Sequence, residues 1–192
     1  MLTPLDPDLV KFADLFESND LPCMVVGSVA SVVWGEPRST LDIDLVVAAL
    51  PEDAERIAAL FKEPQYYAPP IEVIRREIIR GTRGTFNIID TETGLKSDIY
   101  VNANDPVNAW GMARRVAVET DHATIFVAPV SCVIAGKLRY YAMSKQDKHL
   151  RDIRGMLRLS SSLVDVAFVN SVAEQYGVMD HWTNCQRQPG AE

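Results

Sequence analysis

The chain has 192 residues, of which 47% are hydrophobic and 23% are charged, as in an ordinary globular protein. Its formal net charge of −7 argues against a broad basic face that binds duplex DNA. No stretch approaches the roughly 20 apolar residues that span a membrane, and the first residues lack the basic and apolar regions of a signal peptide, so we expect no membrane association and a cytoplasmic location.

The first half of the chain predicts alternating helices and strands. Apolar residues at helical spacing predict a helix over 8–17, and the apolar run 23–26 predicts a buried strand. Ser28 is expected to cap a second helix, which Gly35 and Pro37 end. The further expected elements are a strand over 41–47, helices over 51–61 and 71–80, and a hairpin of strands over 85–89 and 95–101.

The second half becomes mainly helical after Pro129. A helix over 105–112 and strands over 115–119 and 125–127 are followed by helices over 129–143, 145–159, 163–176 and 178–185. This pattern predicts an α+β fold, in which helices flank a small mixed sheet and a helical C-terminal extension follows. The expected organisation is a core over 1–128, a helical part over 129–185 packed on that core, and a flexible tail over 186–192.

A Gly-Ser pair lies between the predicted strand 23–26 and the helix after it. Gly27 lets the backbone turn tightly and approach a ligand closely. The free N–H groups and the dipole at a helix start attract phosphate, and the Ser28 hydroxyl adds a donor. Taken alone, the pair is better explained by an ordinary helix cap, since serine is common at that position. No Gly-Lys-Ser/Thr sequence follows, so this is not a Walker phosphate loop.

Three acids begin predicted strands. Asp42 and Asp44 are two residues apart on one strand, so their side chains share a face. Two neighbouring carboxylates repel each other unless a cation lies between them, and Mg²⁺ prefers such oxygen ligands. A solvent-exposed strand end is the alternative explanation. Asp98 begins another apolar strand, with Lys96 on its face, and the three carboxylates converge if the two strands pair.

Together these residues resemble the polymerase-beta-like nucleotidyltransferase superfamily, in its minimal bacterial branch, and are most similar to the AbiEii-type toxin nucleotidyltransferases. The superfamily resemblance rests on Gly27, Ser28, Arg38, Thr40, Asp42, Asp44 and Asp98. The AbiEii resemblance rests on Lys96 with Asp98 and on a helical segment that contains Lys137, Lys148, Arg151 and Asp152. The resemblance covers roughly residues 20–160 and implies the nucleotidyltransferase fold for the core.

The resemblance also implies an activity. An enzyme of this kind moves a nucleoside monophosphate from a nucleoside triphosphate (NTP), such as ATP, to an acceptor hydroxyl and releases pyrophosphate. It would hold two Mg²⁺ ions with Asp42, Asp44 and Asp98, and Asp98 would be the general base. The expected nucleotide-binding residues are Gly27, Ser28, Arg38, Thr40 and Lys137. The weaker candidates for the site are Lys96, Lys148, Arg151 and Asp152.

The resemblance leaves the acceptor open among tRNA or other RNA, a protein and a small molecule. It is consistent with the toxin of a toxin–antitoxin or abortive-infection pair, which would have an antitoxin partner. A non-catalytic nucleotide-binding or regulatory module on the same fold is the alternative. Single residues have ordinary explanations too: Lys137 as a surface lysine with a packed stem, Asp152 as the helical partner of Lys148, and Arg38 as the partner of a loop acid.

Overall fold

The computed structural model describes residues 7–37, 39–40 and 42–187. The strands are β1 (Cys23–Val26), β2 (Asp42–Val47), β3 (Tyr66–Tyr67), β4 (Thr85–Asp90), β5 (Lys96–Tyr100), β6 (Val116–Glu119) and β7 (Thr124–Val127). The α-helices are α1 (Pro7–Glu17), α2 (Gly27–Trp34), α3 (Ala54–Leu60), α4 (Ile71–Ile79), α5 (Pro106–Met112), α6 (Val130–Ser144), α7 (Lys148–Ser160), α8 (Val166–Gln175) and α9 (Met179–Arg187).

In this described part of the chain, the strands form one mixed seven-stranded sheet in the order β3-β4-β5-β2-β1-β7-β6. The pairs β2–β5 and β1–β7 are parallel, and the other neighbours are antiparallel. The predicted α+β class, with a mixed sheet flanked by helices, is confirmed. The predicted hairpin is also present as β4 and β5.

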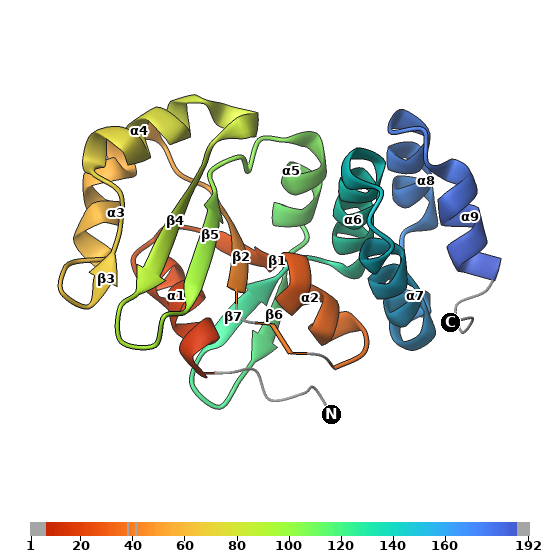
Figure 1. Cartoon of the computed structure of the whole chain (residues 1–192), viewed down its shortest axis with the longest axis horizontal. Coiled ribbons are helices and arrows are strands. Elements are labelled where there is room, and N and C mark those ends of the chain that lie inside the picture. The colour runs from red at the N-terminus through yellow and green to blue at the C-terminus, as the bar shows by residue number, and fades with distance from the viewer. Residues whose placement is uncertain (1–6, 38, 41, 188–192) are drawn as a thin grey trace.

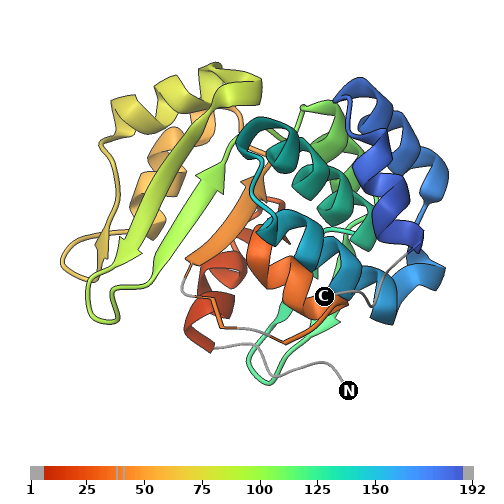
Figure 2. The same ribbon diagram turned by 45° about the vertical axis from the view of Figure 1, so that its right-hand side comes forward.

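Helices gather on two sides of the molecule (Figure 1). The helices α3 and α4 pack together on the left of the view, and α6 to α9 lie on the right, where α6 packs against α2 and α5. The helix α2 packs against β2 and also against α6 and α7, which the turned view shows beside it (Figure 2). The helix α2 therefore lies between β2 and the C-terminal helices α6 and α7.

The element ends differ from the predicted ones for local reasons. The chain turns in a short 3-10 helix over Pro51–Asp53 before α3 begins. Lys145 has a left-handed φ of 55°, which ends α6 and delays α7 to Lys148. The sequence does not predict β3, because a strand of two residues is too short to show an alternating hydrophobic pattern. The helix α9 continues to Arg187, inside the segment expected as a tail, and residues 188–192 lie outside the described part.

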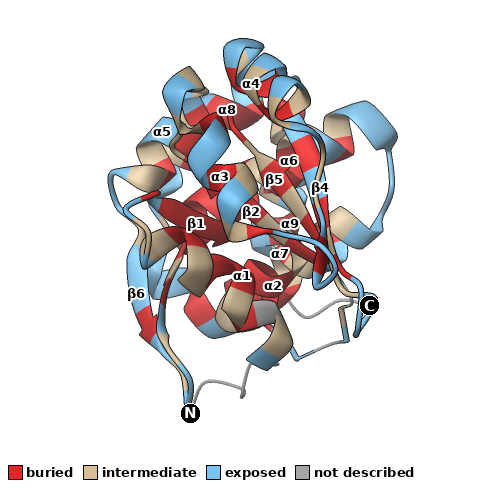
Figure 3. Ribbon diagram, turned by 90° about the vertical axis from the view of Figure 1, so that its left-hand side faces the viewer, coloured by how far each residue is buried: buried red, intermediate tan, exposed pale blue. Residues whose placement is uncertain are grey.

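The core is built around the central strands, and Figure 3 shows buried residues concentrated there. In β2 the residues Ile43, Leu45, Val46 and Val47 are buried, whereas the acid at the strand start, Asp42, is exposed. The helix α1 packs Phe12 and Phe16 against this core with no exposed surface. Among the described residues, no helix has both the length and the apolar character needed to cross a membrane.

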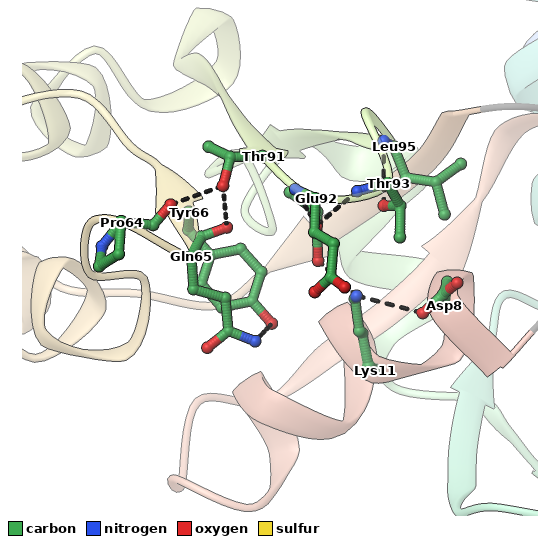
Figure 4. A network of polar contacts seen from close by, with 10 residues as sticks. Asp8, Lys11, Pro64, Gln65, Tyr66, Thr91, Glu92, Thr93 and Leu95 are labelled. Atoms are coloured by element: carbon green, nitrogen blue, oxygen red, sulfur yellow. Dashed lines mark hydrogen bonds and ion pairs between the residues drawn. The ribbon is translucent and has the colours of Figure 1, made fainter.

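A polar network ties α1 to the turn between β4 and β5 (Figure 4). The Asp90 carboxylate is 2% exposed and forms an ion pair with Lys11 of α1. It also accepts hydrogen bonds from the backbone N–H groups of Glu92 (2.9 Å) and Thr93 (3.0 Å). Burial alone would raise the pKa of Asp90, but the Lys11 ammonium and the two N–H donors lower it below its usual value.

We expect Asp90→Asn to lower the free energy of unfolding by about 2 kcal/mol at pH 7, because Lys11 loses its buried anionic partner. The lowered pKa means that this contribution is complete above the ordinary aspartate pKa of about 3.9 and disappears as the pH falls through the lower folded value. Urea unfolding of both proteins at pH 7 and in acid measures this difference. Glu92→Gln, an exposed carboxylate in the same turn, is the control and should change little.

Candidate functional site

The chain turns sharply where β1 meets α2. Gly27 has a φ of +61°, and a Cβ atom at this position would lie 1.9 Å from Asp44 Oδ2. Only glycine therefore fits here, and the start of α2 lies directly against the acid of β2. The backbone N–H of Ser28 donates a hydrogen bond to the Asp44 carboxylate.

The structure corrects the predicted cap of α2. The N-cap position is Val26, which has extended backbone and makes no side-chain cap bond, and Ser28 lies within the first turn of the helix. The left-handed Gly27 makes the turn without help from a capping hydroxyl. The Ser28 side chain therefore does not have the capping role that the sequence predicts.

The strand pairing brings the predicted acids together. β5 lies parallel to β2, with Asp98 as the register partner of Asp44 and Lys96 as the partner of Asp42. Register partners on neighbouring strands point to the same face of the sheet. The condition under which the sequence predicts convergence, namely that these two strands pair, is thus met. Thr40 lies just before β2, and its hydroxyl donates to the Asp42 carbonyl at 3.2 Å; Arg38 lies outside the described residues.

The charges at this face are partly balanced by protein groups. Burial raises the pKa of Asp44, and the nearby Asp98 carboxylate raises it further. The Ser28 N–H, the Tyr100 hydroxyl and the Lys137 ammonium act in the opposite direction. Holding Asp44 ionised therefore has a cost, which a cation at the acid pair would reduce.

Lys96 supplies one such cation. Its Nζ lies 3.1 Å from Asp98 Oδ2, and this hydrogen bond, together with the neighbouring acids, raises the pKa of Lys96. Within 7–37, 39–40 and 42–187, no three His, Cys, Asp or Glu side chains lie close enough together to hold a metal ion. The pair Asp44 and Asp98 still offers hard oxygen donors whose repulsion a divalent cation would relieve, and Asp42 lies at the exposed end of the same strand.

Lys137 of α6 faces this acid pair from the helical side. It is only 6% exposed, and its Nζ lies 2.6 Å from Asp152 Oδ2 on α7. This position corrects the view of Lys137 as a surface lysine, and it also gives Asp152 a partner other than Lys148. Lys148 and Arg151 are both exposed at the start of α7.

A cavity of about 460 Å³ opens between the sheet and the C-terminal helices. The predicted site residues in its wall are Gly27, Ser28, Asp44, Lys137, Lys148 and Asp152. Asp98 adjoins this wall as the register partner of Asp44. The cavity thus brings the start of a helix, a strand acid and a buried lysine to one place.

The cavity wall also contains residues outside the predicted site, of which Tyr100, Tyr140 and His149 contact one another or the acid of β2. The Tyr100 hydroxyl donates to Asp44 Oδ1 at 3.3 Å and shares a hydrogen bond with the Tyr140 hydroxyl. Burial and these partners raise the pKa of Tyr100, so its hydroxyl stays protonated. The ring of Tyr140 lies beside His149. Tyr100 follows Asp98 by two residues, so the strand period could have found it, but Tyr140 and His149 come together only because α6 packs on α7.

The chain matches no protein-family model, and no curated protein matches its sequence. Solved structures do match. The solution structure of the antibiotic-resistance factor ANT(2'')-Ia has 14% sequence identity and a TM-score of 0.59, with 92% of this chain and 96% of that chain covered. The crystal structure of an antigenic nucleotidyltransferase-like protein from Paracoccidioides brasiliensis has 12% identity and a TM-score of 0.54, with 96% and 95% covered. The chain has the nucleotidyltransferase fold that its sequence predicts.

Proposed function

We propose that this protein is a metal-dependent nucleotidyltransferase, which moves a nucleoside monophosphate from an NTP to an acceptor hydroxyl and releases pyrophosphate. The observation that carries the proposal is the close approach of Gly27, at the start of α2, to Asp44, whose register partner is Asp98. A phosphate-binding helix start thus adjoins a pair of oxygen donors for a cation. The fold supports the same conclusion.

The residues would divide the work as follows. The first N–H groups of α2, at Gly27 and Ser28, would bind the terminal phosphates, and a bound phosphate would compete with Asp44 for the Ser28 N–H. Lys137, oriented by Asp152, would neutralise triphosphate charge. Asp98 would accept the proton of the attacking hydroxyl. The other proposed contributors are Arg38, Thr40, Lys96, Lys148 and Arg151.

Asp42, Asp44 and Asp98 would hold two Mg²⁺ ions, which would supply charge stabilisation for the transferring phosphoryl group and the departing pyrophosphate. The acceptor would be RNA, such as tRNA, a protein or a small molecule. An RNA or protein acceptor would fit the toxin of a toxin–antitoxin pair. ATP is the first NTP to test.

The proposed activity is tested by incubating the protein with each α-³²P-labelled NTP and Mg²⁺. The acceptor panel should contain total tRNA, the protein itself, a cell lysate and aminoglycosides, since one matching structure is an antibiotic-resistance factor. Transfer of label with release of pyrophosphate is the expected result. Absence of transfer from every NTP to every acceptor would contradict the proposal.

A second candidate function is a non-catalytic nucleotide-binding or regulatory module. The Lys96–Asp98 ion pair favours it, because an ammonium group can replace a metal ion next to the acids without supporting catalysis. Calorimetric titration with ATP, with and without Mg²⁺, separates the two functions. Tight binding that does not need Mg²⁺ and produces no labelled acceptor would support the module.

Tyr100 is expected to position Asp44 for the reaction. Tyr100→Phe removes the hydroxyl that donates to Asp44 Oδ1 at 3.3 Å, and it should lower kcat about fivefold while leaving the KM for the NTP nearly unchanged. Steady-state transfer kinetics measure both constants. Tyr67→Phe, at an exposed tyrosine of β3, is the matched control; an equal loss in that variant would remove the positioning role.

A further inference from the structure

Two aromatic rings from different helices line the same cavity as Ser28 and Asp44. Tyr140 of α6 and His149 of α7 are nearly parallel, with their ring centroids 6.0 Å apart and an interplanar angle of 19°. Tyr140 is 42% exposed, so part of its ring is open to a ligand. Such an aromatic surface accepts the flat face of another ring.

His149 also carries an unsatisfied polar atom. Its Nδ1 is buried and has no hydrogen-bond partner among the described residues. Buried polar atoms are normally paired, so this nitrogen would gain a hydrogen bond if a small movement of the side chain exposed it to a ligand in the cavity. Burial lowers the pKa of His149, and the ammonium groups of Lys137 and Lys148 lower it further against the opposing effect of Asp152. A neutral imidazole nitrogen can donate or accept a hydrogen bond, as the partner requires.

The charges in the cavity wall favour an anionic ligand. The wall contains the cations Lys137, Arg139 and Lys148, of which Lys137 forms an ion pair with Asp152 and Arg139 with Asp105. Lys148 is exposed next to His149 in the sequence. The exposed ammonium of Lys148 in this wall suits a phosphate-bearing molecule better than a polycationic one such as an aminoglycoside.

The aromatic pair is connected to the acid of β2. The Tyr140 hydroxyl shares a hydrogen bond with the Tyr100 hydroxyl, which in turn donates to Asp44 Oδ1. Two hydroxyls therefore separate the rings from the carboxylate. The start of α2 and the two rings line one cavity, so a nucleotide with its phosphates at the start of α2 would have its base in the same cavity as the rings.

We propose that Tyr140 and His149 form a nucleobase-binding site, in which a base stacks on the exposed part of this aromatic pair. The base has two sources, the NTP itself or the terminal nucleotide of an RNA acceptor. The inference rests on the proposed function for the presence of a nucleotide, and it adds the residues that recognise the base.

The test is a binding titration of the whole chain by calorimetry in the presence of Mg²⁺. The ligands are the four NTPs, inorganic tripolyphosphate and a short single-stranded RNA. The variants are Tyr140→Leu, His149→Gln and Tyr140→Phe, which keeps the ring. The matched controls are Tyr67→Leu and His122→Gln, at an exposed tyrosine and an exposed histidine far from the cavity wall in sequence. The melting temperature of each variant checks that it is folded. If Tyr140→Leu does not fold, the binding data of His149→Gln alone test the nucleobase site.

If the base is that of the NTP, Tyr140→Leu and His149→Gln weaken the binding of at least one NTP about tenfold and leave the affinity for tripolyphosphate unchanged. Tyr140→Phe then binds every ligand with the affinity of the parent protein. If the base is that of the acceptor, the same variants weaken the RNA and leave the NTPs unchanged. The inference is overturned if both variants keep the parent affinity for every ligand. It is also overturned if their affinity for tripolyphosphate falls as much as their affinity for the NTPs or the RNA.

The same variants separate the two proposals. Base-dependent binding without any nucleotidyl transfer overturns the proposed function and leaves the nucleobase site standing. If the parent protein and both variants transfer nucleotide at the same rate, the nucleobase site is overturned and the proposed function stands. A parent protein that binds neither NTPs nor RNA overturns both.

Discussion

Asp44→Asn is expected to lower the rate of nucleotidyl transfer by at least about 100- to 1000-fold, the loss seen when a group that stabilises transition-state charge is removed. Asparagine keeps the size of the side chain but removes the negative charge that Asp44 places next to Asp98. Asp98→Asn should cause a loss of similar size, because it removes both a metal ligand and the proposed base. Transfer of label from the α-phosphate measures the rates.

The stability of Asp44→Asn separates catalysis from folding. The pKa of Asp44 is raised in the folded protein, first by burial and then by Asp98. A raised carboxyl pKa means that the folded state loses stability as the pH rises through that value. We therefore expect Asp44→Asn to be at least as stable as the parent protein at pH 7 in urea unfolding. A variant that is inactive because it is unfolded would contradict this account, and Asp121→Asn, in an exposed turn, is the control.

Gly27→Ala is expected to abolish transfer and to lower the free energy of unfolding by about 2–4 kcal/mol. The new Cβ would lie 1.9 Å from Asp44 Oδ2, and an L-residue at a φ of +61° is strained in any surroundings. The start of α2 must move away from Asp44 or the acid must turn, and either change separates the phosphate-binding turn from the acid pair. Thermal and urea unfolding measure the stability.

Two variants divide this effect into its causes. Gly94→Ala has a φ of +74° with no atom within 4 Å of the added Cβ, so it reports backbone strain alone. In the background of Asp44→Gly, Gly27→Ala should cost no more than Gly94→Ala, because the whole colliding side chain is gone, including the Cβ of Asp44 that would lie 2.9 Å from the new Cβ. If Gly27→Ala remains equally damaging in that background, the contact with Asp44 is not the cause.

Predictions that rest on local sequence patterns agree with the structure better than those that depend on backbone angles or on contacts between distant residues. Binary patterns predict the strands around Asp44 and Asp98 well, since the period of two is a local property. The predicted Ser28 cap is wrong because a cap depends on backbone angles, and the left-handed Gly27 makes the turn by itself. The register that places Asp98 opposite Asp44, and Lys96 opposite Asp42, is a property of the assembled sheet.

By itself, the sequence determined the α+β class, the order of the longer elements, the Gly-Ser turn and the three strand acids, because each depends on neighbours within a few residues. Only the tertiary structure decided that Lys137 pairs with Asp152 and not with solvent, and that Tyr140 lies beside His149. Both contacts join α6 to α7, and no local period specifies which faces of two helices will meet, although the helices follow each other along the chain.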